Sequence, residues 1–182
     1  MKALRLMKWK SEAELVEVPK PTPGPGQVVI KIGGAGACYS DLHLMHDFSE
    51  GQLPPIGWQP PFTLGHENAG WIDSIGAGVS RFREGDPVAV YGAWPYGEGG
   101  GGGLVINGGM AEYMLVPFER LLIDLPDGLK PVDAAPLTDA ALTPYHAIKK
   151  SWAKLTLDAF IIIIGVGGLG HMAVQIAKVT TG

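Results

Sequence analysis

Cysteine is nearly absent from this sequence, which has one, Cys38, among 182 residues. A single thiol cannot form an intramolecular disulfide bond, nor can it supply the four sulfur ligands of a structural zinc site. An excess of positive charge is absent too, because 14 Lys and Arg stand against 18 Asp and Glu and the formal net charge is −4. This balance argues against nucleic acid as a partner.

Long apolar runs and a secretory leader are also missing. The longest apolar run, 160–164, is far shorter than the roughly 20 residues that a membrane-spanning helix needs. The first residues mix basic side chains with isolated apolar ones and lack the apolar centre of a signal peptide. We therefore expect no membrane partner and a cytoplasmic location.

Glycine and proline, by contrast, are abundant, with 27 and 15 residues, and predict short strands joined by turns. Runs rich in β-branched and apolar residues predict the strands of a β-barrel-like domain at 28–32, 70–76, 87–91, 111–116 and 121–125. Six of the seven residues 97–103 are glycine, which predicts a flexible surface loop. With Asp133 as N-cap, alanine and leucine predict a helical segment that extends to Ile148 and is interrupted near Pro144.

The end of the sequence has the pattern of a strand, a glycine turn and a helix. An apolar run at 159–164 predicts a buried parallel strand, and a helix is expected from about Leu169 to Val179. Residues 165–170 between them match the G-x-G-x-x-G fingerprint, whose glycines let the backbone approach a pyrophosphate at a helix N-terminus. A merely structural strand-to-helix turn is the alternative. The acidic residue that holds the ribose is expected about 20 residues further on, so NAD cannot be distinguished from NADP.

Two further segments carry side chains suited to metal binding. Cys38 lies in Gly-Ala-Cys-Tyr-Ser-Asp-Leu-His at 36–43, and His66 lies in Thr-Leu-Gly-His-Glu-Asn-Ala-Gly at 63–70. Taken singly, Cys38 is either a metal ligand or a small buried apolar side chain. His66 is either a ligand or a hydrogen-bonded histidine, so neither residue decides the function alone.

Four motifs in this order resemble the zinc-containing medium-chain alcohol dehydrogenases. They are Gly-Ala-Cys-x-Ser-Asp-x-His at 36–43, Gly-His-Glu-x-x-Gly at 65–70, Pro-Leu-Thr-Asp-Ala at 136–140 leading to Thr-Pro-Tyr-His at 143–146, and the glycine fingerprint. The resemblance covers essentially the whole chain and is close to bacterial secondary-alcohol dehydrogenases. It implies a mixed α/β fold, with a GroES-like, β-barrel-type catalytic domain over 1–150 and the first β-α unit of a Rossmann domain over 151–182.

The resemblance also implies a metal centre and a proton relay. Cys38, His66 and Asp139 correspond to the three ligands of one catalytic zinc, whose fourth position stays open for water or a substrate oxygen. Ser40 corresponds to the hydroxyl that takes the alcohol proton, and His43 to the outer end of that relay. A surface or turn position remains the alternative for Ser40 and His43.

Further residues correspond to positions around the zinc and the cofactor. Asp41 and Glu67 match carboxylates beside the zinc, where Glu67 contributes to the catalytic machinery. The cofactor-binding positions correspond to Tyr39, Thr143, Gly165, Gly167, Gly168, Leu169 and Gly170. Trp94 either lines the substrate pocket or is an ordinary aromatic residue.

The implied activity is the interconversion of a small alcohol and its aldehyde or ketone, with zinc and NAD or NADP. A zinc-free quinone or enoyl reductase of the same superfamily and a non-catalytic zinc-binding domain are the alternatives. The sequence departs from the family at Tyr39, where relatives often carry a charged residue, and it lacks the lobe that holds a structural zinc. Because that lobe often supports subunit contacts in the family, its absence leaves undecided whether the protein forms a homo-oligomer. Because the sequence stops at Gly182, we expect weak or no dehydrogenase activity from these 182 residues alone.

Overall fold

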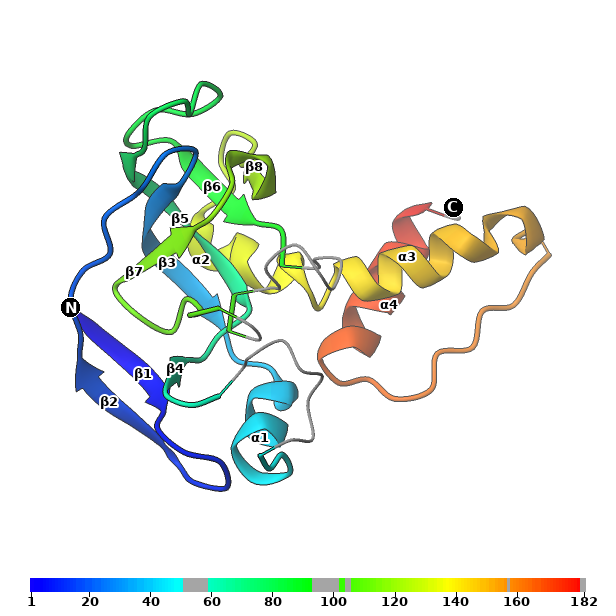
Figure 1. Ribbon diagram of the computed structural model, residues 1–182. Helices are drawn as coiled ribbons and strands as arrows, with labels where there is room; N and C mark the ends of the chain where they lie inside the picture. The colour runs from blue at the N-terminus through cyan, green and yellow to red at the C-terminus, as the bar shows by residue number, and fades with distance from the viewer. Residues whose placement is uncertain (51–58, 93–101, 104–105, 157, 181–182) are drawn as a thin grey trace.

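A computed structural model describes residues 1–50, 59–92, 102–103, 106–156 and 158–180 (Figure 1). Most of the glycine-rich segment predicted as a loop, and Trp94, lie outside these residues. The described chain forms a barrel-like body of two antiparallel sheets, and a smaller helical part extends to one side of it (Figure 1).

The strands follow the predicted order. The five-stranded sheet has the order β7-β3-β5-β6-β8 and consists of β3 (Val28–Gly36), β5 (Glu67–Ile75), β6 (Pro87–Val90), β7 (Tyr113–Val116) and β8 (Leu122–Asp124). The three-stranded sheet has the order β2-β1-β4 and consists of β1 (Lys2–Leu6), β2 (Ala13–Glu17) and β4 (Phe62–Thr63). The strands predicted from β-branched and apolar runs are therefore confirmed, with ends shifted by a few residues.

The ladder between β3 and β5 brings two of the sequence motifs together. Its last pair places Gly36 opposite Glu67, so that the segments carrying Cys38 and His66 leave the same end of the sheet. A side chain at Gly36 would collide with the carboxylate of Glu67. Glycine at this position therefore makes room for an acidic side chain that is almost fully buried.

The larger core fills the space enclosed by the five-stranded sheet. It contains Val28, Ile30, Ile72, Phe82, Val88, Val90, Met114, Val116, Leu121 and Leu122, all buried. Burial of these side chains gives the sheet that supports the site most of its stability, because apolar area is removed from water.

Replacement of Leu122 by alanine tests this core. Leu122 is 1% exposed, whereas its neighbour Ile123 on β8 is 49% exposed. We expect Leu122→Ala to lower the free energy of unfolding by about 2–5 kcal/mol and Ile123→Ala by less than about 1 kcal/mol. Urea denaturation followed by circular dichroism measures both, and equal losses in the two variants would contradict this assignment of the core.

The helical segment after the barrel differs from the prediction. It divides into α2 (Pro131–Ala134), the 3-10 helix η2 (Ala135–Thr138) and α3 (Leu142–Ser151), and its first N-cap is Lys130 rather than Asp133. The backbone leaves the helical conformation at Asp139, with φ −132° and ψ −59°. The interruption expected near Pro144 is therefore present and lies at 139–141, so that Pro144 stands in the first turn of α3, where a missing N–H costs no hydrogen bond.

The last helix, α4 (Gly168–Thr180), confirms the predicted helix and packs beside α3 (Figure 1). The buried strand predicted at 159–164 is wrong for the described chain, because these residues form no strand. Phe160, Ile162 and Ile164 are 97%, 83% and 95% exposed. A parallel strand needs a neighbour for its backbone hydrogen bonds, and the described residues provide none beside this segment.

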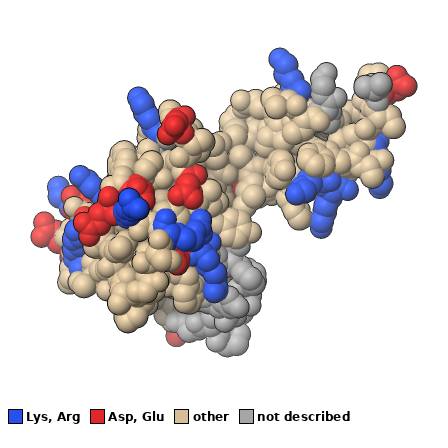
Figure 2. All heavy atoms as spheres, turned by 90° about the horizontal axis from the view of Figure 1, so that it is seen from above, with Lys and Arg blue, Asp and Glu red and all other residues tan. Residues whose placement is uncertain are grey.

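Charges are mixed over the barrel-like body. Figure 2 shows acidic and basic side chains interspersed on the visible face of this body, whereas the helical part carries mainly Lys and Arg on that face.

Three more short elements complete the described chain, namely α1 (Tyr39–His46), η1 (Glu119–Leu121) and η3 (Trp152–Lys154). None of the described helices has the length and apolar character required to cross a membrane.

Candidate metal centre

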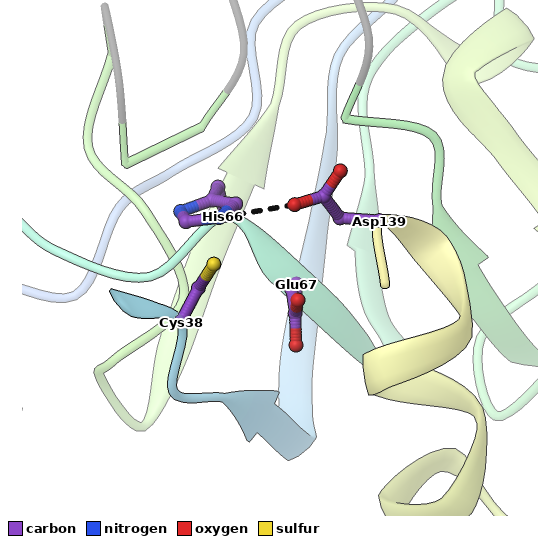
Figure 3. Close-up of side chains that lie close together, drawn as sticks. All are labelled: Cys38, His66, Glu67 and Asp139. Carbon is purple, nitrogen blue, oxygen red and sulfur yellow. Dashed lines mark ion pairs between the residues drawn. The ribbon is translucent and has the colours of Figure 1, made fainter. Parts of the chain in front are cut away.

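Four donor side chains from three separate segments meet at the end of the β3–β5 ladder. Cys38 is the N-cap of α1, His66 and Glu67 stand at the start of β5, and Asp139 follows η2. Their sulfur, nitrogen and oxygen ligand atoms all lie within 4.8 Å of one another. In Figure 3 the Cys38 sulfur and the Asp139 carboxylate are directed toward the His66 ring, and Glu67 lies beside them.

Local hydrogen bonds hold the Cys38 segment in place. The backbone N–H of Cys38 donates to Oδ2 of Asp41 at 3.0 Å, which satisfies a donor at the start of α1. The same carboxylate reaches His66, because its Oδ1 lies 3.5 Å from Nδ1 of the ring. Asp41 thus connects the loop that presents the thiol to the residue that presents the imidazole.

The His66 ring is buried, and its two nitrogen atoms face different groups. Nε2 lies 3.4 Å from Oδ2 of Asp139 and 3.2 Å from Oγ of Ser40, whereas Nδ1 faces Asp41. The ring therefore presents Nε2 to the other donors. Of the predicted relay residues, Ser40 reaches this nitrogen directly.

The electrostatics of the cluster are those of an imidazole surrounded by carboxylates. Burial lowers the pKa of His66, but the facing carboxylates of Asp139 and Asp41 outweigh it and raise the pKa to about 11. The hydrogen bond with His66 lowers the pKa of Asp139, whereas burial raises the pKa of Glu67. So many acidic groups in a small volume require a positive charge among them, from an imidazolium or from a metal cation.

The residues fit a zinc ion. Thiolate, imidazole and carboxylate are the ligand types of zinc, and a catalytic site uses three protein ligands. Nδ1 of His66 and Oδ1 of Asp41 are both buried and have no hydrogen-bond partner in the described chain, although they face each other. A ligating histidine commonly turns its second ring nitrogen toward a carboxylate in this way.

Three other predicted residues lie around the cluster without joining it. His43 is half exposed and pairs through Nδ1 with Asp47, while its ring meets that of Tyr39 edge-on at 4.7 Å. Among the described contacts, none joins His43 to Ser40. Thr143 donates from Oγ1 to Oδ1 of Asp139 at 3.4 Å, which places it beside one member of the cluster.

The glycine fingerprint forms a tight turn before α4. Gly165 has φ +87°, a conformation that favours glycine, and a side chain at Gly170 would collide with the carbonyl oxygen of Gly165. By contrast, a Cβ atom at Gly167 or Gly168 would meet no other atom within 4 Å, and Leu169 is 42% exposed. The turn is therefore closely packed where Gly170 meets Gly165, whereas it leaves open space beside Gly167 and Gly168.

Comparison with known proteins identifies the family. Residues 24–127 match the model of the alcohol dehydrogenase GroES-like domain. The chain belongs to this family. It is 39% identical to the NAD-dependent alcohol dehydrogenase of Sulfurisphaera tokodaii, with 100% of this chain and 56% of that protein covered. It is 37% identical to the alcohol dehydrogenase of Moraxella sp. (strain TAE123), with 97% and 54% covered.

Solved structures agree with this family and with the mixed α/β fold. The alcohol dehydrogenase of the archaeon Aeropyrum pernix superposes with a TM-score of 0.86 at 37% identity and covers 100% of this chain and 57% of its own. Acetophenone reductase of Geotrichum candidum, solved in complex with NAD, gives a TM-score of 0.84 at 36% identity, with 99% and 55% covered. The chain thus spans a little over half the length of these dehydrogenases, and the part it shares with them includes the GroES-like domain.

Two contacts around the donor cluster were missed from the sequence. Asp47 stands four residues after His43, a spacing that brings two side chains together on a helix, so its pairing was accessible from the sequence. Thr143 also stands four residues after Asp139, but the chain between them is not a continuous helix. Spacing alone therefore gave no reliable signal for the contact of Thr143 with Asp139.

Proposed function

We propose that this chain is the zinc-binding part of an alcohol dehydrogenase, with Cys38, His66 and Asp139 as the ligands of one catalytic zinc. The observation that carries the proposal is the convergence of a thiol, a buried imidazole and carboxylates within 4.8 Å. Glu67 is the additional donor of this group and is the carboxylate next to the zinc. The family membership supports the same assignment, because the relatives include NAD-dependent alcohol dehydrogenases.

When bound, zinc supplies a Lewis acid that polarises the substrate oxygen and lowers the pKa of the alcohol. The protein residues then move the proton and position the groups. Ser40, whose hydroxyl lies 3.2 Å from Nε2 of His66, takes the alcohol proton, and His43, on the next turn of α1, passes it toward solvent. Asp41 orients His66 through Nδ1, and Thr143 orients Asp139.

The cofactor in this proposal is NAD or NADP, which would accept the hydride. Gly167 and Gly168, on the open side of the turn where α4 begins, would hold its pyrophosphate, because a helix N-terminus favours an anion. Tyr39, 70% exposed, is the proposed contact at the other side of the cofactor. In domain terms, residues 1–150 are the GroES-like catalytic domain, and 151–182 begin the Rossmann domain.

Metal analysis tests the proposal directly. The chain purified without chelator and dialysed at neutral pH is expected to hold about one zinc per molecule, measured by plasma mass spectrometry. A folded sample with less than about 0.2 zinc per chain would instead support a zinc-free reductase of the same superfamily. If zinc is present but NADH causes no change in protein fluorescence at millimolar levels, the chain binds zinc without turnover.

A further inference from the structure

A cavity of about 520 Å³ lies between the β1–β2 hairpin and α1. Cys38 is the only one of the four donor residues that lines it, so the cavity meets the metal centre at its sulfur side. Its volume falls within the roughly 300–1,000 Å³ of typical small-molecule sites. Apolar walls come from the three-stranded sheet through Leu4 and Ala13, from α1 through Leu42 and Met45, and from loop residues Leu64 and Met110.

The polar groups of this cavity are acidic or aromatic. Glu12 stands at its rim with 82% of its side chain exposed, and Asp41 lies deep in it at 4%. None of the described residues that line the cavity is lysine or arginine. His46 approaches Glu12 at 3.8 Å but does not line the cavity.

Tyr39 adds an aromatic face to the same cavity and is 70% exposed. A positive charge within about 6 Å of such a ring is attracted by its quadrupole, and this attraction suits quaternary ammonium groups in particular. A bound zinc ion would not make the charge around the cavity positive. The anions of Cys38 and Asp139 would balance the dication, and the carboxylate of Asp41 would still add a negative charge. The cavity therefore favours a cation with an apolar part over an anion.

We propose that this cavity binds an alkylammonium cation, with its apolar chain against the walls and its charged head between Glu12 and Tyr39. The proposal does not depend on the dehydrogenase activity, because neither hydride transfer nor a bound cofactor is needed for this contact. Of the four donor residues only Cys38 lines the site, so the cavity adjoins the metal centre on one side, and it shares Tyr39 with the proposed cofactor contact.

Butyltrimethylammonium is the probe of choice, because a quaternary nitrogen has no lone pair and cannot bind zinc. Isothermal titration calorimetry of the metal-containing chain is expected to show one site. Tetramethylammonium should bind more weakly, by about fourfold for each methylene removed, and heptanoate should not displace butyltrimethylammonium. Displacement by heptanoate at an equal concentration would overturn the proposal.

Three variants place the site. Glu12→Gln should weaken binding of butyltrimethylammonium about fivefold, the effect of one exposed charge pair. Glu14→Gln is the matched control, because Glu14 is an exposed acid of the same hairpin outside the cavity and should leave binding unchanged. Ala13→Phe fills the cavity and should remove binding while zinc content stays the same. Equal losses in the two glutamine variants, or full binding to Ala13→Phe, would refute the assignment.

Discussion

Cys38→Ser is expected to lower the affinity for zinc by about a hundredfold or more. Replacing a residue that only supports a zinc ligand already lowers metal affinity by up to about a hundredfold, and loss of a ligand itself should cost at least as much. A serine hydroxyl is a much weaker zinc ligand than a thiolate, and Asp139 and His66 alone cannot complete a three-ligand site. Zinc content after dialysis and competition with a chelator of known affinity measure this loss.

Because Cys38 is the single cysteine of the sequence, its role as a ligand can also be tested in the wild-type protein by labelling the thiol. A thiol-reactive dye reports on Cys38 alone. Its reaction should be slow in the zinc-containing protein and should accelerate when a chelator removes the metal. Reaction at one rate with and without chelator, in a protein that contains zinc, would contradict the assignment of Cys38 as a ligand.

Ser40→Ala is the control that separates metal binding from proton transfer. Ser40 contacts His66 through its hydroxyl but is not a proposed ligand. The variant should therefore keep about one zinc per chain and lose about 10²–10⁴-fold in turnover, the usual contribution of a positioned proton-transfer group. Loss of zinc from this variant would show that Ser40 supports the metal rather than the proton.

The barrel was accessible from the sequence because strands give local signals, whereas the donor cluster followed only from the resemblance to the dehydrogenase family. Strands such as β3 follow from runs of β-branched residues, and the pairing of Gly36 with Glu67 then brings the motifs that carry Cys38 and His66 to one end of the sheet. The resemblance implied that Cys38, His66 and Asp139 lie together, and the structure brings their ligand atoms within 4.8 Å of one another. What the sequence could not predict is which nitrogen of His66 faces the other donors.

Other failures have a common physical cause, since they concern residues whose state depends on distant neighbours. The apolar run at 159–164 has the composition of a buried strand, but strand formation requires a partner strand, and none of the described residues pairs with it. The interruption expected near Pro144 is present, but the sequence did not place it at 139–141, ahead of the helix in whose first turn Pro144 stands. The cavity beside Glu12 depends on how the β1–β2 hairpin faces α1, which no periodicity encodes.

Gly170→Ala is expected to disrupt the glycine turn and with it the binding of the cofactor. The new methyl group would collide with the backbone carbonyl of Gly165, which is not a flexible group that can move aside. Overpacking of this kind costs about 1–3 kcal/mol, and the first turn of α4 should open. Hydrogen exchange of the α4 amides should accelerate, and the dissociation constant for NADH, measured by fluorescence, should rise by about tenfold or more.

Gly167→Ala and Gly168→Ala show whether that loss arises from the turn or from the ligand. Both positions have open space for a methyl group, so neither variant should open α4. Gly167 occupies a glycine position of the fingerprint, where the pyrophosphate approaches the backbone, and its variant should bind NADH weakly while α4 stays protected. Gly168 lies on the same open side of the turn, so its variant should also bind NADH weakly while α4 stays protected. Binding like that of the wild type in both variants, beside weak binding by Gly170→Ala, would mean that the turn serves the fold alone.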